Sequence, residues 1–155
     1  MRISPLVSQT FQRLAGIRAL LELLDQALPE SEWRESEALK QLADEQNWDF
    51  SDFDTESHIL NERFRFWLPR YTAYSVIMLL HTVLETQLIS AAEAVHARKR
   101  LPFRPSDLRG RGVETSALYL TRAGVYDVRN DSAWQSIGDL RDLRHLIVHR
   151  AGTKG

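Results

Sequence analysis

The stretch that decides the fold of this chain is Ser75–Ala92, "SVIMLLHTVLETQLISAA". It contains neither Gly nor Pro, and its apolar residues recur at spacings of three and four, which is the pattern of a helix. Its only ionisable residues are His81 and Glu85, one helical turn apart. We therefore expect a central, largely buried helix of about residues 69–99 whose apolar stretch, Ser75–Ala92, carries two titratable side chains.

The sequence on both sides of this helix is helical almost throughout, and no convincing strand pair appears. Proline, glycine and a capping box Ser132-x-x-Gln135 predict the ends of the remaining helices. The expected helices are 5–28 (ended by Pro29), 31–46, 56–68, 113–124 (ended by Gly124) and 132–150, with loops at 47–55 and 98–112. The sequence thus predicts an all-α fold, a helical bundle of about five to six helices in a single domain, 1–155.

Composition limits the kinds of function. A chain of 155 residues with 43% hydrophobic residues is long enough for a core of its own. Cysteine is absent, which excludes disulfides, a thiolate nucleophile and a thiolate metal site. The N-terminus lacks the pattern of a signal peptide. The longest uninterrupted apolar run, Val76–Leu80, is far shorter than the roughly 20 residues that span a bilayer. We expect a cytoplasmic protein without a membrane partner.

The charge is divided unevenly along the chain. Residues 1–62 carry 13 acidic and 5 basic side chains, whereas residues 63–155 carry 8 acidic and 15 basic ones. Of the 20 basic residues 17 are arginine, whose planar guanidinium suits phosphate or carboxylate. A basic C-terminal half indicates a polyanionic ligand weakly. The alternative is that the two halves neutralise each other within the fold or across a dimer.

The second informative stretch is Arg141–Arg150, "RDLRHLIVHR", near the end of the last predicted helix. At about 100° per residue, Arg141, His145 and His149 share one side of the helix with Gly138, which would let a ligand or another backbone approach. The apolar arc on the other side consists of Ile137, Leu140, Leu143, Leu146, Ile147 and Val148.

Arg144 projects into that apolar arc. An unpaired buried charge costs several kcal/mol, so a guanidinium there must reach water or meet a carboxylate. Glu85 has the complementary need in the middle of the apolar helix. We therefore expect Arg144 and Glu85 to lie near each other, or one of them to reach a partner subunit.

The spacing of Arg144 and His149, R-x4-H with a polar residue after the arginine, resembles the signature of the HEPN superfamily (higher eukaryotes and prokaryotes nucleotide-binding domain). The Leu-rich lead "IGDLRDLRHLIVH" and the apolar helix with its central Glu85 resemble the same family over residues 65–152. The acidic N-terminal helices, 1–62, match it only as generic helices. In the family the residue after the arginine is most often Asn or Asp, and here it is His145.

The resemblance implies a dimeric, metal-independent endoribonuclease without a cofactor, of the kind found in toxin–antitoxin and phage-defence systems. His149 would transfer protons, Arg144 would stabilise the phosphate, and His145 would carry a second proton or orient the site. Glu85, Arg141 and His81 would support them. The loop arginines would hold the flanking phosphates of RNA. These are Arg98, Arg100, Arg104, Arg109 and Arg111.

Other functions remain open at this point. A HEPN-like fold also serves as a non-catalytic dimeric interaction or nucleotide-binding module, with an antitoxin or regulatory protein as a possible partner. The two histidines could be simply solvated or packed. A metal site from His145 and His149, with His81 and Glu85 as a second pair, lacks the E-x-x-H pairs of di-iron bundles. A DNA-reading helix or a membrane-surface helix fits the last helix less well.

Overall fold

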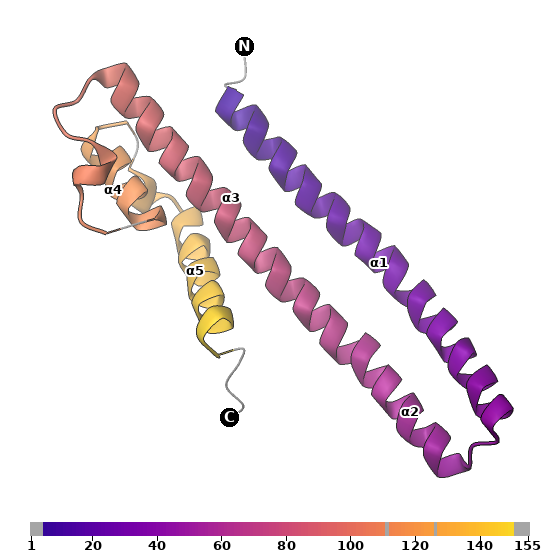
Figure 1. Ribbon diagram of the computed structural model, residues 1–155. Coiled ribbons are helices and arrows are strands. Elements are labelled where there is room, and N and C mark those ends of the chain that lie inside the picture. The colour runs from indigo at the N-terminus through magenta and orange to yellow at the C-terminus, as the bar shows by residue number, and fades with distance from the viewer. Residues whose placement is uncertain (1–4, 111, 126, 151–155) are drawn as a thin grey trace. The chain divides into compact units, whose positions relative to one another are not determined.

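A computed structural model describes residues 5–110, 112–125 and 127–150 of the chain (Figure 1). The described residues are almost all helical and include no strand, so the predicted all-α class is confirmed. The long elements are α1 (Pro5–Gln46), α2 (Phe50–Glu62), α3 (Leu68–Lys99), α4 (Val113–Arg122) and α5 (Ala133–Arg150). A π-helical turn, Arg63–Trp67, joins α2 to α3, and short 3₁₀ turns occupy Pro105–Asp107 and Val128–Asn130.

The chain divides into two compact units. One consists of 16–76, and we call it the hairpin unit. The other consists of 1–15 and 77–155, and we call it the motif unit because it contains the R-x4-H stretch. The prediction of a single domain stays a prediction.

Pro29 does not end a helix, contrary to the sequence prediction. It lies inside α1, which continues without a break from Pro5 to Gln46. A proline inside a helix removes one hydrogen bond and costs about 3 kcal/mol relative to alanine. The helix continues in spite of this cost, and beyond Pro29 the side chains of Glu32 and Glu35 form exposed ion pairs with the helical segment that follows α2.

The predicted loop 47–55 is shorter than expected. Only Asn47, Trp48 and Asp49 interrupt the helices, and α2 begins at Phe50. Asn47 adopts a left-handed conformation, with φ of 51°, which asparagine tolerates better than most residues. Asp49 then caps α2, since its Oδ1 accepts a hydrogen bond of 2.9 Å from the backbone N–H of Asp52. Because this segment is acidic, the sequence predicted a loop at a place where a capped helix begins.

Pro69 does not separate two helices either. The π-helical turn Arg63–Trp67 precedes it, and the N–H of Leu68 bonds to the carbonyl of Arg63, five residues back. The π-helical turn is wider than an α-helical turn, so it moves away the backbone carbonyl with which the ring of Pro69 would otherwise clash. The predicted five to six helices therefore become four continuous ones within the described residues, because α2, the π-helical turn and α3 form one run.

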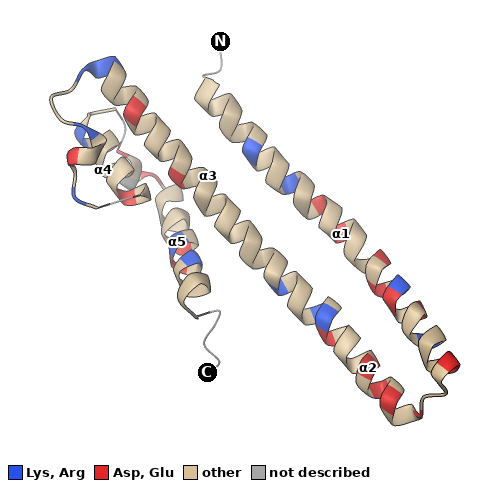
Figure 2. Cartoon of the chain, in the orientation of Figure 1, with Lys and Arg blue, Asp and Glu red and all other residues tan. Residues whose placement is uncertain are grey.

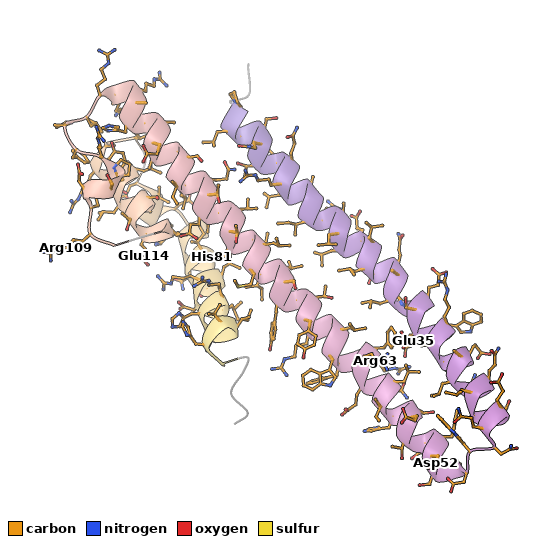
Figure 3. All side chains as sticks on the ribbon, viewed as in Figure 1. Glu35, Asp52, Arg63, His81, Arg109 and Glu114 are labelled. Atoms are coloured by element: carbon orange, nitrogen blue, oxygen red, sulfur yellow. The ribbon has the colours of Figure 1, made fainter. Side chains whose placement is uncertain are left out.

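The hairpin unit is held partly by ion pairs between α1 and the segment that follows α2. Arg63 Nη1 lies 2.6 Å from Glu35 Oε2, and Arg65 Nε lies 3.2 Å from Glu32 Oε1. Figure 3 shows Glu35 and Arg63 facing each other across the two helices. Leu60 and Phe64 are buried on the same helical run. Acidic residues predominate around this end of α1 and along α2 (Figure 2).

The core of the motif unit is small and lies between α3 and α4. It consists of Ala92, Tyr119, Leu120 and Ala123, all buried, with residues of the 98–112 loop packed against them. The Tyr119 hydroxyl donates to the carbonyl of Phe103 at 3.3 Å and lies 3.2 Å from His96 Nδ1. Burial, with the carboxylates of Glu93 and Asp107 nearby, raises the pKa of Tyr119. This core fixes the end of α3, the loop and α4 as one body.

The apolar helix is less buried than the sequence predicts. Within α3 only Gln87 and Ala92 are buried, and Leu79 and Ile89 are exposed. The run Phe50–Lys99 contains an 18-residue window with a mean hydropathy of 1.4, so by length and composition it reaches what a membrane-crossing helix needs. The sequence prediction considered only uninterrupted apolar residues, and it therefore did not detect this 18-residue window. One such helix is weak evidence for a membrane, since core helices of soluble proteins have the same composition.

Candidate functional site

The R-x4-H stretch lies on α5, as the sequence predicts. Asp131 caps this helix, since its Oδ1 accepts a hydrogen bond of 2.8 Å from the N–H of Ala133. The predicted capping box therefore does not form as expected: the Gln135 amide instead donates to Asp139 at 3.4 Å. The ring centroids of His145 and His149 are 4.2 Å apart, with the planes tilted by 52°. Both histidines are exposed, so one ligand can touch both.

Arg144 lies on the inner side of α5, between residues that are partly covered. Leu140 and Ile147 share this intermediate exposure, whereas Leu143, Leu146 and Val148 are exposed. The Arg144 Nε is buried and has no hydrogen-bond partner. A buried polar atom without a partner is uncommon in native proteins and calls for a physical explanation.

Arg144 and Glu85 form no ion pair within the described chain, so the expectation that they lie near each other, or that one of them reaches a partner subunit, stays a prediction. Among the described residues no carboxylate oxygen lies within the 4.0 Å of an ion pair from the Arg144 guanidinium. Glu85 is not buried enough to need a cation, since its side chain is 39% exposed. The guanidinium of Arg144 is therefore unneutralised in the described structure.

Glu85 lies instead at the start of α4. Its Oε1 is 2.5 Å from the position that a Cβ on Gly112 would occupy, and Gly112 is the N-cap of α4. A carboxylate at a helix N-terminus is stabilised by the partial positive charge of the helix dipole. His81 Nδ1 lies 3.9 Å from Glu85 Oε2, and its side chain is only 12% exposed. His81 and Glu85 thus lie next to each other, and Glu85 contacts the entry of α4.

Gly112 is a residue that the sequence analysis missed. Its φ of 74° and ψ of −144° belong to a region that side chains rarely adopt, and the Glu85 carboxylate fills the space where a side chain would begin. The signal in the sequence was the Gly-x-Gly of the loop, "GRG", directly before an amphipathic helix. Gly112 allows α4 to start against α3.

Arg141 bridges α5 to α4. Its guanidinium contacts the carboxylate of Glu114 in the first turn of α4, and its Nη2 lies 3.0 Å from Asp142 Oδ1. The hydrogen bond to Asp142, with Glu114 adding to it, raises the pKa of Arg141. Arg141 therefore holds α5 in place, and its positive charge is largely satisfied. Figure 3 shows Glu114 at this junction, on the same side of α3 as His81.

The junction of α4 and α5 encloses little space. A cavity of about 20 Å³ lies between Val113, Glu114, Trp134, Gly138 and Arg141. This is room for about one water molecule. Nothing lies within 4 Å of a Cβ built on Gly138, so no group of the described chain makes the close approach that this glycine would permit to a ligand or another backbone. The chemistry of α5 is therefore presented on an open face.

The loop arginines are exposed. In the described part of the loop they form no ion pair, and Figure 3 shows Arg109 extending away from the ribbon. Packing of Leu101, Phe103 and Leu108 against the Tyr119 core holds the loop backbone. These arginines are Arg98, Arg100, Arg104 and Arg109; Arg111 lies outside the described residues. Figure 1 shows α5 running away from this loop, so the loop arginines and the histidines are not brought together within one chain.

The groups gathered on α5 are suited to acid–base chemistry beside an anion. His145 and His149 offer two exposed imidazoles, and Arg144 offers a cation without a carboxylate. No group of three His, Asp or Glu side chains able to hold a metal ion occurs in the described ranges. The described residues therefore offer pairs of possible metal ligands and not a group of three.

Comparison of this chain with protein-family models, with curated proteins and with solved structures finds no match.

Proposed function

We propose that this protein is a HEPN-like, metal-independent endoribonuclease that acts as a homodimer. The observation that carries the proposal is the state of Arg144: a guanidinium on the inner side of α5, with a buried Nε and no carboxylate partner, on the same helix as two contacting histidines, His145 and His149. A structural arginine in a helical protein is normally paired when buried. An unneutralised arginine and two imidazoles on one helix are the groups that an anionic, proton-transferring reaction needs.

The reaction is a transesterification within RNA. The 2′-oxygen attacks the adjacent phosphorus, the bond from phosphorus to the 5′-oxygen breaks, and a 2′,3′-cyclic phosphate and a 5′-hydroxyl form. His149 takes the 2′-hydroxyl proton or supplies the proton of the leaving oxygen, and His145 is the second proton carrier or orients the site. Arg144 stabilises the additional negative charge on the phosphoryl group.

A dimer accounts for the features that one chain leaves incomplete. Leu143 and Leu146 form an exposed apolar edge on α5, and Val148 is exposed at the other margin of the apolar arc. The cavity next to Arg141 is too small for a nucleotide. A second copy against this edge would cover it and bring two sets of arginine and histidine to one cleft. Light scattering at micromolar concentration tests the dimer, and a monomer there would remove the composite site.

The decisive experiment is cleavage of a labelled single-stranded RNA in EDTA. Wild-type protein is expected to cleave it, and His149→Ala to lose about 100-fold to 10,000-fold of the rate. Arg144→Ala is expected to lose about 100-fold to 1,000-fold. Arg144→Lys keeps the charge but not the planar fork, so it is expected to fall between the two.

Two matched variants serve as controls. His58→Ala removes an exposed histidine of α2, and Arg122→Ala removes an exposed arginine at the end of α4. Both are expected to cleave like wild type. The endoribonuclease proposal fails if wild-type protein cleaves nothing, or if His149→Ala and Arg144→Ala cleave as fast as the two controls.

The second candidate is a non-catalytic HEPN-like module that binds a nucleotide or a regulatory protein. The open face of α5 favours it, since a binding surface needs no enclosed site. Equilibrium binding of RNA without cleavage, lost in Arg144→Ala, would identify this function. For either candidate we place the protein in the cytoplasm, where RNA and an antitoxin or other regulator would be met.

A further inference from the structure

The hairpin unit carries a group of flat side chains that the proposed function does not use. They lie on consecutive turns where the π-helical turn runs into α3. We call this group the Arg70 cluster. Its members are Phe66, Trp67, Arg70, Tyr71 and Tyr74.

Rings surround the guanidinium of Arg70. Its Cζ lies 5.5 Å from the ring centroid of Phe66, 6.0 Å from that of Trp67 and 5.4 Å from that of Tyr74. These distances are within the range of cation–π attraction. The Arg70 Nε also donates a hydrogen bond to the Tyr74 hydroxyl. Four contacts thus hold a long side chain that would otherwise be free in water.

Arg70 differs from the other arginines of its unit. Arg18, Arg34, Arg63 and Arg65 each pair with a glutamate. Within the described residues no carboxylate lies at ion-pair distance from Arg70. The cluster therefore presents a full positive charge, held in place by rings.

The aromatic members are available to a ligand. Phe66 is 51% exposed, Trp67 40% and Tyr71 55%. The rings of Trp67 and Tyr71 are nearly parallel, at 26°, with centroids 5.9 Å apart. Leu60 and Phe64 of the same helical run are buried, whereas these three rings remain exposed. A π-helical turn at this point is notable, because such turns occur often at functional sites.

The chemistry of the cluster selects a flat anionic ligand. All five members are planar π groups, and none is aliphatic. A membrane-binding helix face requires aliphatic side chains that enter the lipid, with cations at its margins. Aromatic rings around a fixed arginine are instead the elements with which proteins bind single-stranded nucleic acid: bases stack on the rings, and the cation meets a phosphate.

We infer that the Arg70 cluster is a binding surface for unpaired nucleotides of RNA. The choice of RNA rests on the proposed endoribonuclease function; the stacking itself does not, and it is measured without cleavage. The cluster lies in the hairpin unit and the R-x4-H stretch in the motif unit, so either surface can be disabled by itself.

The test is fluorescence anisotropy with a labelled oligouridylate of about 12 nucleotides, in EDTA and with full-length protein carrying His149→Ala. In this His149→Ala protein, the double substitution Trp67→Ala, Tyr71→Ala is expected to weaken RNA binding at least about 10-fold. Trp67→Phe keeps a ring and is expected to bind nearly as well. The matched control is Trp33→Ala, which removes a tryptophan that is 66% exposed elsewhere in the same unit and is expected to change nothing.

A second readout separates stacking from a structural role. RNA is expected to quench tryptophan fluorescence in the full-length protein, and Trp67→Phe is expected to bind RNA with most of that quenching lost. A duplex of the same length is expected to bind independently of Trp67, since its bases are already stacked.

Three results would overturn the inference. The first is that the oligouridylate does not bind. The second is that the protein with both Trp67→Ala and Tyr71→Ala binds it as well as the Trp33→Ala control does. The third is that the protein binds anionic phospholipid vesicles in place of RNA, in a way that depends on Trp67. Loss of cleavage in the EDTA assay would leave this binding measurement unaffected, so failure of the enzyme proposal and failure of the surface are distinguishable.

Discussion

The hairpin unit and the motif unit use arginine in opposite ways. In the hairpin unit four of the five arginines form ion pairs with glutamates, Arg70 being the exception, and two of those pairs join separate helices. In the motif unit the described loop arginines and Arg144 form none, and Arg141 is the paired exception. An arginine with a carboxylate is a structural element, and one without it is a site for an anion. Whether an arginine has a carboxylate partner therefore identifies candidate functional residues better than the net charge of the chain does.

The largest effect is expected when Arg144 is given the carboxylate that it lacks. Val148 is exposed and lies one turn after Arg144 on α5, so Val148→Glu places an acid at the i, i+4 position. We expect RNA cleavage to fall about 100-fold, since the guanidinium is then neutralised. The measurement is the cleavage rate in EDTA. Val148→Gln, of the same size but neutral, is the control, and equal rates for the two variants would break the comparison.

In the hairpin unit, the next largest effect is expected from Pro29→Ala. This change restores a backbone hydrogen bond in the middle of α1, and we expect stability to rise by about 2–3 kcal/mol. Urea unfolding followed by circular dichroism measures it. An unchanged midpoint would mean that α1 bends or frays at this residue in solution.

In the motif unit, Gly112→Ala is expected to lower stability by about 1–2 kcal/mol, because alanine rarely adopts a φ of 74°. The clash with Glu85 adds less, since a carboxylate at the end of a flexible side chain can move. Thermal unfolding of Gly112→Ala and of Gly112→Ala with Glu85→Ala separates the two contributions. The loss is expected to persist in the double variant; full recovery there would assign it to the clash.

A smaller effect is expected at the core of the motif unit. Tyr119→Phe removes the hydrogen bond to Phe103 and is expected to cost about 1 kcal/mol at neutral pH. Because the pKa of Tyr119 is raised in the folded state, its contribution is fully present below the unfolded value of 10.0 and is lost as the pH rises through the folded one. Unfolding measured from pH 8 to 11 is expected to show a steeper alkaline decline for wild type than for Tyr119→Phe. Parallel curves would contradict it.

The smallest effect is expected for the ion pair of Glu35 and Arg63. Pairs this exposed contribute about 0–1 kcal/mol and weaken with salt. Glu35→Arg is expected to destabilise slightly at low salt, and Glu35→Arg with Arg63→Glu to restore stability. A loss in the single variant that high salt does not diminish would show that the pair acts through packing.

The sequence predicted the helical elements well and their interruptions poorly. Periodicity located α3, α4 and α5 closely, since apolar spacing is a local property. It predicted breaks at Pro29 and Pro69 that the structure does not make. At Pro69 the preceding π-helical turn compensates for the proline, whereas at Pro29 α1 continues although a backbone hydrogen bond is lost.

At the candidate site the sequence placed residues on faces correctly but could not show which charges pair within the chain. His145 and His149 contact each other, and Arg144 lies on the inner side of α5, as the helical wheel indicates. The wheel has no information about neighbouring elements. It could not show that Glu85 lies at Gly112, nor that Glu114 is the carboxylate of α4 that pairs with Arg141.

The sequence by itself therefore determined the helical class, the faces of each helix and the presence of a charge on the apolar side of α5. Only the tertiary structure decided which charges are neutralised. The reason is physical: a helix face follows from the fixed rotation per residue. An ion pair depends instead on a separation of a few ångströms between atoms that can be far apart in the chain, as with Arg63 and Glu35. Arg144 and Arg70 stand out because the fold places them beyond the reach of the described carboxylates.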